Sequence, residues 1–293
     1  MDHLERSIAD LVRAAIDEDV GPGDITSLAC LEPKPVRATI TAKSRGAVSG
    51  LVPAALVFAM VDPAIRFEPV MADGSLFEPG HVVVGISGRN QTLLTAERTA
   101  LNFMAHLSGV ATLTAEFVRR VQGTRCHILD TRKTTPGWRL LEKQAVLHGG
   151  GYNHRLGLYD MMLIKDNHIA AAGSIAAAVE AAHNYLESTD CRQRFGLNAE
   201  SVAIEVEVTS TEQVRQALSA GVRRLLLDNQ TPASLKQLVR TARDIDDSVK
   251  LEASGNVSLD NVAALAATGV DYISIGALTH SAPACDFSLN IDV

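Results

Sequence analysis

The sequence predicts an α/β protein in which an N-terminal α+β domain is followed by a parallel β/α domain. With 293 residues, 46% of them hydrophobic, the chain is long enough to bury one large core or two smaller ones. From residue 126 onward, short apolar segments alternate with amphipathic helical segments, which predicts a parallel sheet with right-handed crossovers. The first hundred residues or so lack this alternation, and this indicates a separate domain.

In the first domain, the spacing of apolar residues predicts a small set of helices and strands. The helices are expected at residues 4–17, 53–60 and 91–109, and the strands at 36–42, 65–70 and 82–88. Glu97 and Arg98 lie in the middle of the third helix, which is otherwise mostly apolar. An internal salt bridge and a solvent-facing stripe would each account for this pair. The domain boundary is expected near Gly109.

The second domain is predicted to contain six strands separated by helical segments. The strand candidates are CHILDTRK (126–133), MMLIKDNH (161–168), VAIEVEV (202–208), RRLLLDN (223–229), VKLEAS (249–254) and DYISIGA (271–277). Most of the helical segments between them begin with Ser, Thr or Pro or end at Gly, as helices commonly do. The glycines at 149–151 follow one of these segments and act either as a helix stop or as a phosphate-binding turn.

Charge and composition argue against several classes of protein. The net charge of −7 would repel nucleic acid and anionic membranes, so neither is an expected partner. The N-terminal segment lacks the apolar core of a signal peptide, and the longest apolar stretch, 51–61, is shorter than the roughly 18 residues that span a membrane. The four cysteines form no C-x-x-C pair, which argues against a disulfide framework or a structural zinc site. A cytoplasmic protein is expected.

Charged and small residues follow the predicted strands at their carboxyl ends. In a parallel β/α domain the loops at these ends converge on one site. The residues are Arg132, Lys133, Lys165, Glu207, Asp228, Ser254, Gly255 and Gly276. Between residues 129 and 165, basic side chains outnumber acidic ones although the whole chain is acidic. This local reversal of charge predicts a site for an anion.

The later strands contribute acidic side chains and small residues. Glu205 and Glu207 are two residues apart and therefore face the same side of their strand. Glu205, deeper in the strand, is expected to pair with a lysine or arginine of a neighbouring strand, whereas Glu207 is expected in the functional site. Asp228 is also expected there, with capping of its own loop as the alternative. Backbone N–H groups at the last two loops are expected to hold a phosphate, at Ser254, Gly255, Gly276 and Ala277.

Several motifs, in the same order along the chain, resemble quinolinate phosphoribosyltransferase, also called nicotinate-nucleotide pyrophosphorylase (carboxylating). They are ERTALNFMAHLSG, DTRKTTPGWR, GGGYNHRLGLYDMMLIKDNH, EVEV, LLLDN, EASGN and VDYISIGALTHS. The resemblance implies an N-terminal α+β sandwich at 1–108 and an incomplete, open β/α barrel of about six strands at 109–275. It also implies a C-terminal tail, 276–293, that packs back on the first domain, and a homodimer.

The implied reaction is a glycosyl transfer in de novo NAD synthesis. With Mg²⁺, the phosphoribosyl group of 5-phosphoribosyl 1-pyrophosphate would pass to quinolinate, giving nicotinate mononucleotide, CO₂ and pyrophosphate. The expected quinolinate ligands are Arg132, His154, Arg155 and Lys165, with Arg98 from the other subunit. The expected ligands of the phosphoribosyl donor are Lys133, Glu207, Asp228, Ser254, Gly255, Gly276 and Ala277. The expected catalytic residues are Lys133, Lys165, Glu207 and Asp228, of which the two acids would face Mg²⁺ directly or through water.

Two alternatives remain at this point. A related barrel linked to molybdenum transport has similar motifs and a different substrate, but the full set of cationic positions argues against it. A non-enzymatic sensor of a phosphosugar or a pyridine carboxylate would keep the fold without the chemistry. The presence of both Glu207 and Asp228 argues against a sensor.

Overall fold

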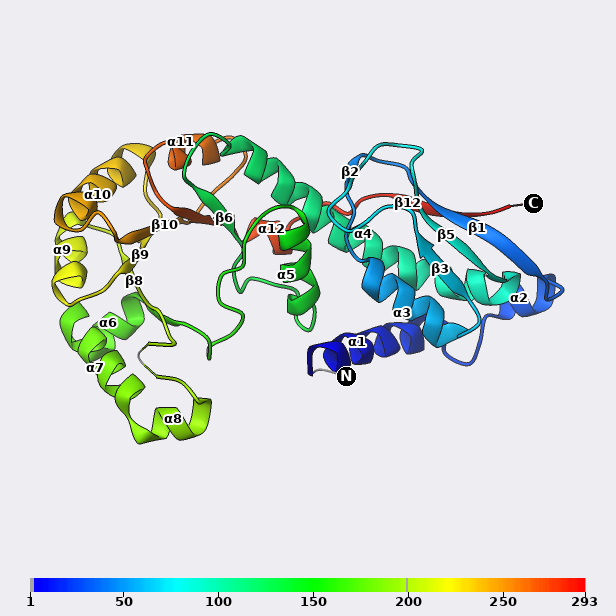
Figure 1. The fold of residues 1–293 in the computed structure, drawn as a ribbon, viewed down its shortest axis with the longest axis horizontal. Coiled ribbons are helices and arrows are strands. Elements are labelled where there is room, and N and C mark those ends of the chain that lie inside the picture. Colours follow the sequence, from blue (N-terminus) through cyan, green and yellow to red (C-terminus); the bar gives the residue numbers. More distant parts are fainter. Residues whose placement is uncertain (1–2, 199, 293) are drawn as a thin grey trace. The chain divides into compact units, whose positions relative to one another are not determined.

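The computed structural model of the protein describes residues 3–198 and 200–292. It forms two compact units that are interleaved along the chain (Figure 1). The first unit is built from the residues up to 115, from 133–151 and from the residues after 276, and the second from 116–132 and 152–276. The sequence predicts a linear division at residues 108 and 275, and this division stays a prediction. In the structure the chain passes between the two units more often than such a division supposes.

The first unit contains a four-stranded antiparallel sheet with the strand order β12-β1-β5-β3. The strands are β1 (Pro35–Ala42), β3 (Arg66–Pro69), β5 (Val82–Arg89) and β12 (Phe287–Ile291), and β2 (Gly46–Ala47) pairs separately with β4 (Leu76–Phe77). Because side chains alternate along a strand, Ile40, Val84 and Ile86 share one face and are buried. Pairing of β12 with β1 brings the C-terminal segment into this sheet.

Among the described residues, six helices belong to the first unit, and the three that the sequence predicts at 4–17, 53–60 and 91–109 are longer than expected. The six helices are α1 (His3–Val20), α2 (Ile25–Cys30), α3 (Leu51–Val61), α4 (Asn90–Arg120), α5 (Arg139–His148) and α12 (Ala277–His280). The expected end of α4 at Gly109 is wrong. A Cβ atom on Gly109 would overlap the carbonyl group of Pro283, and the neighbouring Cys285 donates its N–H to the carbonyl of Ala105 at 3.0 Å. Gly109 therefore serves close packing inside the helix rather than its termination.

The glycines at 149–151 end α5, as one of the two interpretations supposed. Gly149, Gly150 and Gly151 donate their N–H groups to carbonyls of the last turns of this helix, at 2.9 to 3.0 Å. Gly150 adopts φ +81°, a left-handed conformation that glycine tolerates without steric cost. These contacts identify the segment as a helix stop.

The second unit contains one parallel sheet with the strand order β6-β11-β10-β9-β8-β7. The strands are β6 (His127–Leu129), β7 (Met162–Ile164), β8 (Ile204–Val208), β9 (Arg224–Asp228), β10 (Lys250–Ser254) and β11 (Tyr272–Ser274), each within a segment predicted as a strand. Among the described residues, β6 and β7 are the two edges and do not pair with each other. The predicted fold class, with an open barrel of six strands, is confirmed.

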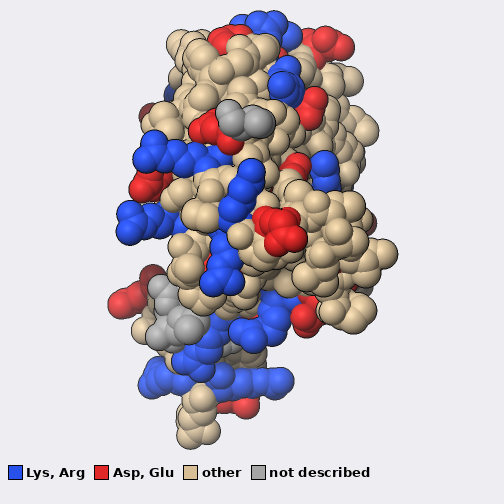
Figure 2. Space-filling model, turned by 90° about the vertical axis from the view of Figure 1, so that its right-hand side faces the viewer, with Lys and Arg blue, Asp and Glu red and all other residues tan. Residues whose placement is uncertain are grey.

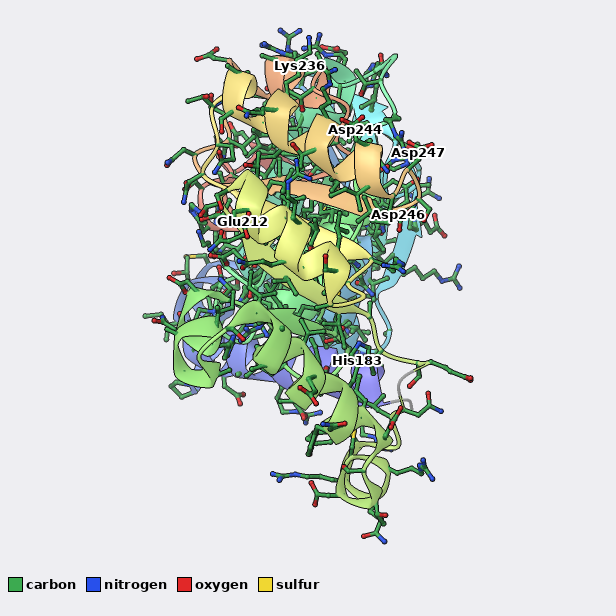
Figure 3. All side chains as sticks on the ribbon, turned by 90° about the vertical axis from the view of Figure 1, so that its left-hand side faces the viewer. His183, Glu212, Lys236, Asp244, Asp246 and Asp247 are labelled. Atoms are coloured by element: carbon green, nitrogen blue, oxygen red, sulfur yellow. The ribbon has the colours of Figure 1, made fainter. Side chains whose placement is uncertain are left out.

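Helices cover the outer face of this sheet. They are α6 (Asp166–Ala172), α7 (Ile175–Glu187), α8 (Thr189–Phe195), α9 (Thr211–Ser219), α10 (Pro232–Ile245) and α11 (Val262–Ala266). Figure 3 shows α7, α9 and α10 from outside, with Glu212 and Lys236 on their exposed surface. The strand residues that face these helices, such as Val206, Leu225 and Leu251, are fully buried. The polar side chains of these strands lie on the opposite, inner face of the sheet, because side chains alternate along a strand.

Charge is unevenly distributed over the surface. Figure 2 presents the side on which α2 lies in Figure 1, and Lys and Arg side chains are prominent there although the net charge is −7. Within residues 3–198 and 200–292, no helix combines the length and the apolar character needed to cross a membrane.

Candidate active site

Four neighbouring strands of the second unit end in a connected row of polar side chains. Lys165 follows β7, and its Nζ lies 3.6 Å from Oε2 of Glu207 on β8. Asp228, the last residue of β9, accepts a 2.6 Å hydrogen bond from the hydroxyl of Ser254, the last residue of β10. Parallel strands in register bring these ends to one edge of the sheet. The structure therefore brings together four residues that the sequence placed in the site.

The two acids of this row influence each other. Burial raises the pKa of Glu207, the charge of Lys165 opposes this rise, and the charge of Asp228 adds to it. Two carboxylates at such proximity attract a cation, and oxygen donors are the ligands that Mg²⁺ prefers. The donor set of Glu207 and Asp228 therefore fits a magnesium ion.

The loops after β9 and β10 are tightly joined. Asn229 adopts φ +52° and donates its N–H to the carbonyl of Ser254 at 2.9 Å. Gly255 adopts φ +88°, and a Cβ atom on it would overlap the side chain of Asn229. Only glycine fits this position without displacing Asn229. Gly276 and Ala277 follow β11, and phosphate binding by these small residues stays a prediction.

A cationic pair lies in the same unit. Arg155 donates through Nη1 to the carbonyl of Met161 at 3.1 Å. Burial lowers the pKa of Arg155, the nearby charge of Arg132 lowers it further, and Asp160 and Glu205 act in the opposite direction. Two partly buried guanidinium groups that repel each other are stabilised by an anion.

Three predicted ligands, Arg98, Lys133 and Ala277, belong to the first unit. Arg98 is exposed on α4, and among the described residues no acidic group forms an ion pair with it, so of the two interpretations the solvent-facing one holds. Lys133 is exposed as well, and its carbonyl accepts a 2.7 Å hydrogen bond from Thr279. Their roles toward the substrates stay predictions.

His154 lies against two buried glutamates. Its Nε2 is 3.1 Å from Oε2 of Glu205 and 3.4 Å from Oε1 of Glu252, and its side chain is 7% exposed. Its Nδ1 accepts the N–H of Arg155 at 2.7 Å. Both ring nitrogens thus have partners within the protein, and direct contact of this ring with quinolinate stays a prediction.

Arg224, on β9, joins the two glutamates. Its Nε lies 2.9 Å from Oε1 of Glu205, and its Nη2 lies 2.6 Å from Oε2 of Glu252. The expected pairing of Glu205 with a basic residue of a neighbouring strand is confirmed. His154, Glu205 and Glu252 offer ligand atoms within 4.8 Å of one another, a spacing that would also suit a metal ion. Because Arg224 already pairs with both carboxylates, the chain itself supplies the positive charge here.

The two glutamates of this cluster differ in their affinity for a proton. Burial raises the pKa of Glu205, but the hydrogen bond from His154 and the charge of Arg224 outweigh it, and the pKa is lowered. Burial and the charge of Glu205 raise the pKa of Glu252 to about 7. Near neutral pH, the cluster therefore contains an ionised Glu205 beside a Glu252 that is partly protonated.

Glu252→Gln should make the protein more stable than wild type at pH 8 while changing its stability much less near pH 5. A carboxyl group whose pKa is raised by folding contributes stability below its unfolded value, near 4.5, and loses that contribution as pH rises through about 7. Glutamine stays neutral throughout, so wild type should lose roughly 1 to 3 kcal/mol more than the variant over this range. Urea unfolding at pH 5 to 8 measures the difference, and parallel stability curves would contradict it.

Sequence reasoning missed three members of the site, of which Asp130 and Glu252 are buried and Arg224 is partly exposed. Arg224 and Glu252 are two residues before Leu226 and Ser254 on their strands and so share the inward face with them. The alternation that placed Glu205 and Glu207 on one face, applied to β9 and β10, would have found both. Asp130, directly after β6, accepts the N–H of His154 at 2.8 Å, a contact with a distant segment that no local pattern indicates.

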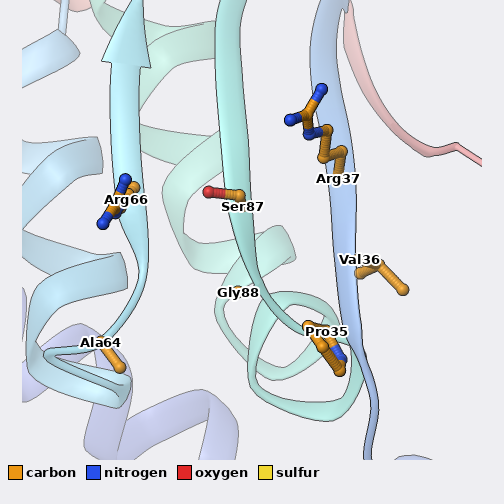
Figure 4. Close-up of a pocket in the computed structure, with 7 residues that line it drawn as sticks. All are labelled: Pro35, Val36, Arg37, Ala64, Arg66, Ser87 and Gly88. Carbon is orange, nitrogen blue, oxygen red and sulfur yellow. The ribbon is translucent and has the colours of Figure 1, made fainter.

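The first unit has a hollow of its own on its sheet, with a volume of about 410 Å³ (Figure 4). Ser87 of β5 lies in register between Arg37 of β1 and Arg66 of β3. The hollow forms because the central strand carries small residues between longer neighbours. It contains none of the predicted site residues.

Comparisons with known proteins agree with this geometry. The family model described as the quinolinate phosphoribosyl transferase N-terminal domain matches residues 24–108, and that of the C-terminal domain matches residues 110–290. A probable nicotinate-nucleotide pyrophosphorylase (carboxylating) of Bacillus subtilis is 40% identical over 291 residues, which are 99% of this chain and 95% of the relative. A mitochondrial quinolinate phosphoribosyltransferase (decarboxylating) of Nicotiana tabacum is 39% identical over 99% of this chain and 84% of its own.

A solved structure extends this similarity to the fold. The nicotinate-nucleotide pyrophosphorylase of Francisella tularensis has a TM-score of 0.90 and 35% sequence identity, with full coverage of both chains. Both halves of the chain match the family, and the relatives cover nearly its whole length. The chain therefore belongs to the quinolinate phosphoribosyl transferase family.

Proposed function

We propose that the chain transfers the phosphoribosyl group of 5-phosphoribosyl 1-pyrophosphate to quinolinate and releases CO₂ and pyrophosphate, forming nicotinate mononucleotide for NAD synthesis. The observation that carries this proposal is the row of strand ends in which Lys165, Glu207 and Asp228 meet, in the unit that also holds the Arg132 and Arg155 pair. Quinolinate is a dianion, and the ribose of the phosphoribosyl donor develops positive charge during the reaction. The strand ends offer cationic side chains for the first and carboxylates for the second.

The cations account for recognition of quinolinate. Its two carboxylates lie on a flat ring and need donors from several directions. Arg132 and Arg155 offer planar forks, and Lys165 offers a point charge. Partial burial of Arg132 and Arg155 strengthens their interactions, because less water competes for the carboxylates.

The acids account for the transfer step. The bond between the anomeric carbon and the pyrophosphate oxygen breaks, and the ring nitrogen of quinolinate forms the new bond to that carbon. Positive charge on the ribose rises as pyrophosphate departs, and preplaced carboxylates of Glu207 and Asp228 stabilise it. The resulting pyridinium then takes up the electron pair as the adjacent carboxylate leaves as CO₂, and a proton replaces it on the ring carbon.

Glu207 and Asp228 would also hold Mg²⁺. When bound, the ion neutralises charge on the leaving pyrophosphate. Lys133 and the backbone at Ser254, Gly255, Gly276 and Ala277 would bind the phosphates of the donor. The working form is proposed to be a cytoplasmic homodimer in which Arg98 enters the site of the other subunit.

The test is direct. Purified protein is incubated with quinolinate, 5-phosphoribosyl 1-pyrophosphate and Mg²⁺, and nicotinate mononucleotide and pyrophosphate are quantified by chromatography. Equal amounts of both products support the proposal. Product from nicotinate but none from quinolinate would assign a different phosphoribosyl acceptor to the chain.

Lys165→Ala and Arg155→Ala should each weaken quinolinate binding by roughly 1.5 to 3 kcal/mol, because each removes a charge-assisted contact to a carboxylate. Binding of the phosphoribosyl donor should change much less. Titration calorimetry measures both affinities. Arg240→Ala is the matched control, because Arg240 is an exposed cation on α10 paired only weakly with Asp244, at 3.9 Å. Unchanged quinolinate affinity in both site variants would remove this cluster from the binding site.

A further inference from the structure

The buried cluster beneath the strand ends contains a carboxyl group that the reaction described above does not use. Glu252 is inaccessible to solvent, and its Oε1 has no hydrogen-bond partner among the described residues. The Nε2 atom of His154 lies 3.4 Å from this oxygen. A protein with an apolar residue of similar volume at such a position would commonly be at least as stable. Stability alone therefore does not explain the presence of this buried carboxyl group.

The hydrogen bonds around His154 define its tautomer. Because Nδ1 accepts the N–H of Arg155, the proton of the neutral ring lies on Nε2. That N–H then faces Glu205 and Glu252, the two acids that Arg224 holds in place. The ring is therefore held on one side by the acids and on the other by the backbone of Arg155.

The same segment is fixed at a second point. The carboxylate of Asp130 accepts the N–H of His154 at 2.8 Å, and the carbonyl of Tyr152 accepts the N–H of Asp130 at 3.1 Å. These contacts fix the backbone of the segment that leads to Arg155. The guanidinium of Arg155 then extends to the carbonyl of Met161, near Arg132.

We propose that Glu252 is a positioning residue of the quinolinate site, which holds His154 in the orientation that fixes the backbone of Arg155 and so places its guanidinium for the substrate. This inference rests on the proposed function. Glu252 itself is too deeply buried to touch substrate, and it acts through His154.

Neutral Glu252 is the form suited to this role. The polar or charged groups that face it are Glu205 from β8, Arg224 from β9, Ser274 from β11 and His154 from the segment after β6. With Glu205 ionised and Arg224 charged, a neutral Glu252 leaves the cluster without net charge. Ionisation of Glu252 adds a negative charge beside His154 and Arg224, in the cluster whose Glu205 already acts on Arg155, and this opposes binding of a dianion.

Glu252→Leu and Glu252→Gln separate positioning from packing. Leucine keeps most of the volume and loses the polar contacts, so the KM for quinolinate should rise about 10- to 100-fold while the KM for the phosphoribosyl donor changes less than about twofold. Glutamine keeps the neutral shape, so its quinolinate KM should stay within about threefold of wild type at pH 7. Between pH 6.5 and 8.5 the quinolinate KM of wild type should rise severalfold, and that of Glu252→Gln should stay nearly flat.

Asp271→Asn is the matched control. Asp271 is a buried carboxylate that bridges Arg125 and Arg243 at 2.6 and 2.7 Å, but it directly precedes β11, at the opposite end of that strand from the site. Its loss should lower stability without a change in either KM. If Glu252→Leu does not fold, Glu252→Asp replaces it, since a shorter side chain withdraws the carboxyl group from His154 and should raise the quinolinate KM about fivefold or more.

The outcomes are distinguishable. Equal changes in both KM values, or equal impairment of the leucine and glutamine variants, would overturn the positioning role. Wild-type protein that forms no nicotinate mononucleotide would refute the proposed function instead. In that case calorimetric affinity for quinolinate replaces KM as the measure, and the inference stands only if Glu252→Leu loses at least about tenfold in affinity and Glu252→Gln does not.

Discussion

Glu207→Gln should lower turnover by about two to three orders of magnitude while leaving quinolinate affinity close to that of wild type. Shape is preserved, and the charge that stabilises the ribose in the transition state is lost. An interaction that strengthens only as the transition state forms changes turnover rather than ground-state binding. Asp228→Asn should act in the same direction, because Asp228 lies beside Glu207 at the end of the next strand.

Steady-state kinetics and calorimetry together measure this effect. Glu212→Gln is the control, because Glu212 is an exposed glutamate at the start of α9, outside the sheet (Figure 3). Its turnover should match that of wild type. Full turnover in Glu207→Gln and Asp228→Asn would leave both acids with a structural role only.

The pH at which Glu207 takes up a proton provides a related check. Burial raises the pKa of Glu207, and Lys165 is the group that opposes the rise. In the metal-free protein, Glu207 should therefore take up its proton at a higher pH than an ordinary glutamate. In Lys165→Ala this proton uptake should move to still higher pH, because the opposing charge is gone, and an NMR titration of the side-chain carboxyl measures both.

The positions of the residues at the strand ends could be predicted from the sequence, because the strands themselves show a periodic pattern of apolar residues. An apolar strand that ends in a charged residue places that residue at the carboxyl edge of a parallel sheet, and Lys165, Glu207 and Asp228 lie there as predicted. Alternation within β8 also separated Glu205, which pairs with Arg224, from Glu207 at the strand end. These inferences need only the strand positions and their order.

The contacts of the buried cluster around His154 could not be predicted from the sequence, because they join segments that are far apart in the chain. The imidazole of His154 was expected to face a substrate, but its two nitrogens contact Glu205 and the backbone of Arg155. Gly109 was read as the end of a helix because glycine commonly ends helices, whereas here it admits the carbonyl of Pro283. In both cases the residue type has two common uses, and only the packing of a remote segment decides between them.

Mixing two inactive variants should restore activity if the protein is a homodimer that shares Arg98 between subunits. Arg98→Ala and Lys165→Ala homodimers should each be nearly inactive, because every site lacks one cation. A two-fold dimer uses the same surface on both subunits, so each site would combine Arg98 of one chain with Lys165 of the other. After unfolding and joint refolding, about half the dimers should be mixed, and each mixed dimer should contain one complete site. Activity should then return to roughly a quarter of that of wild type treated in the same way.

The control pair is Lys165→Ala mixed with Glu207→Gln. These two residues lie 3.6 Å apart in a single chain, so no mixed dimer contains a site with both intact, and mixing should restore nothing. Native mass spectrometry verifies that mixed dimers have formed in both experiments. If the Arg98→Ala and Lys165→Ala mixture stays as inactive as this control, Arg98 does not act across the subunit interface. Because Arg98 is exposed and forms no ion pair among the described residues, a recovery specific to its mixture would assign its guanidinium to the substrate of the partner subunit.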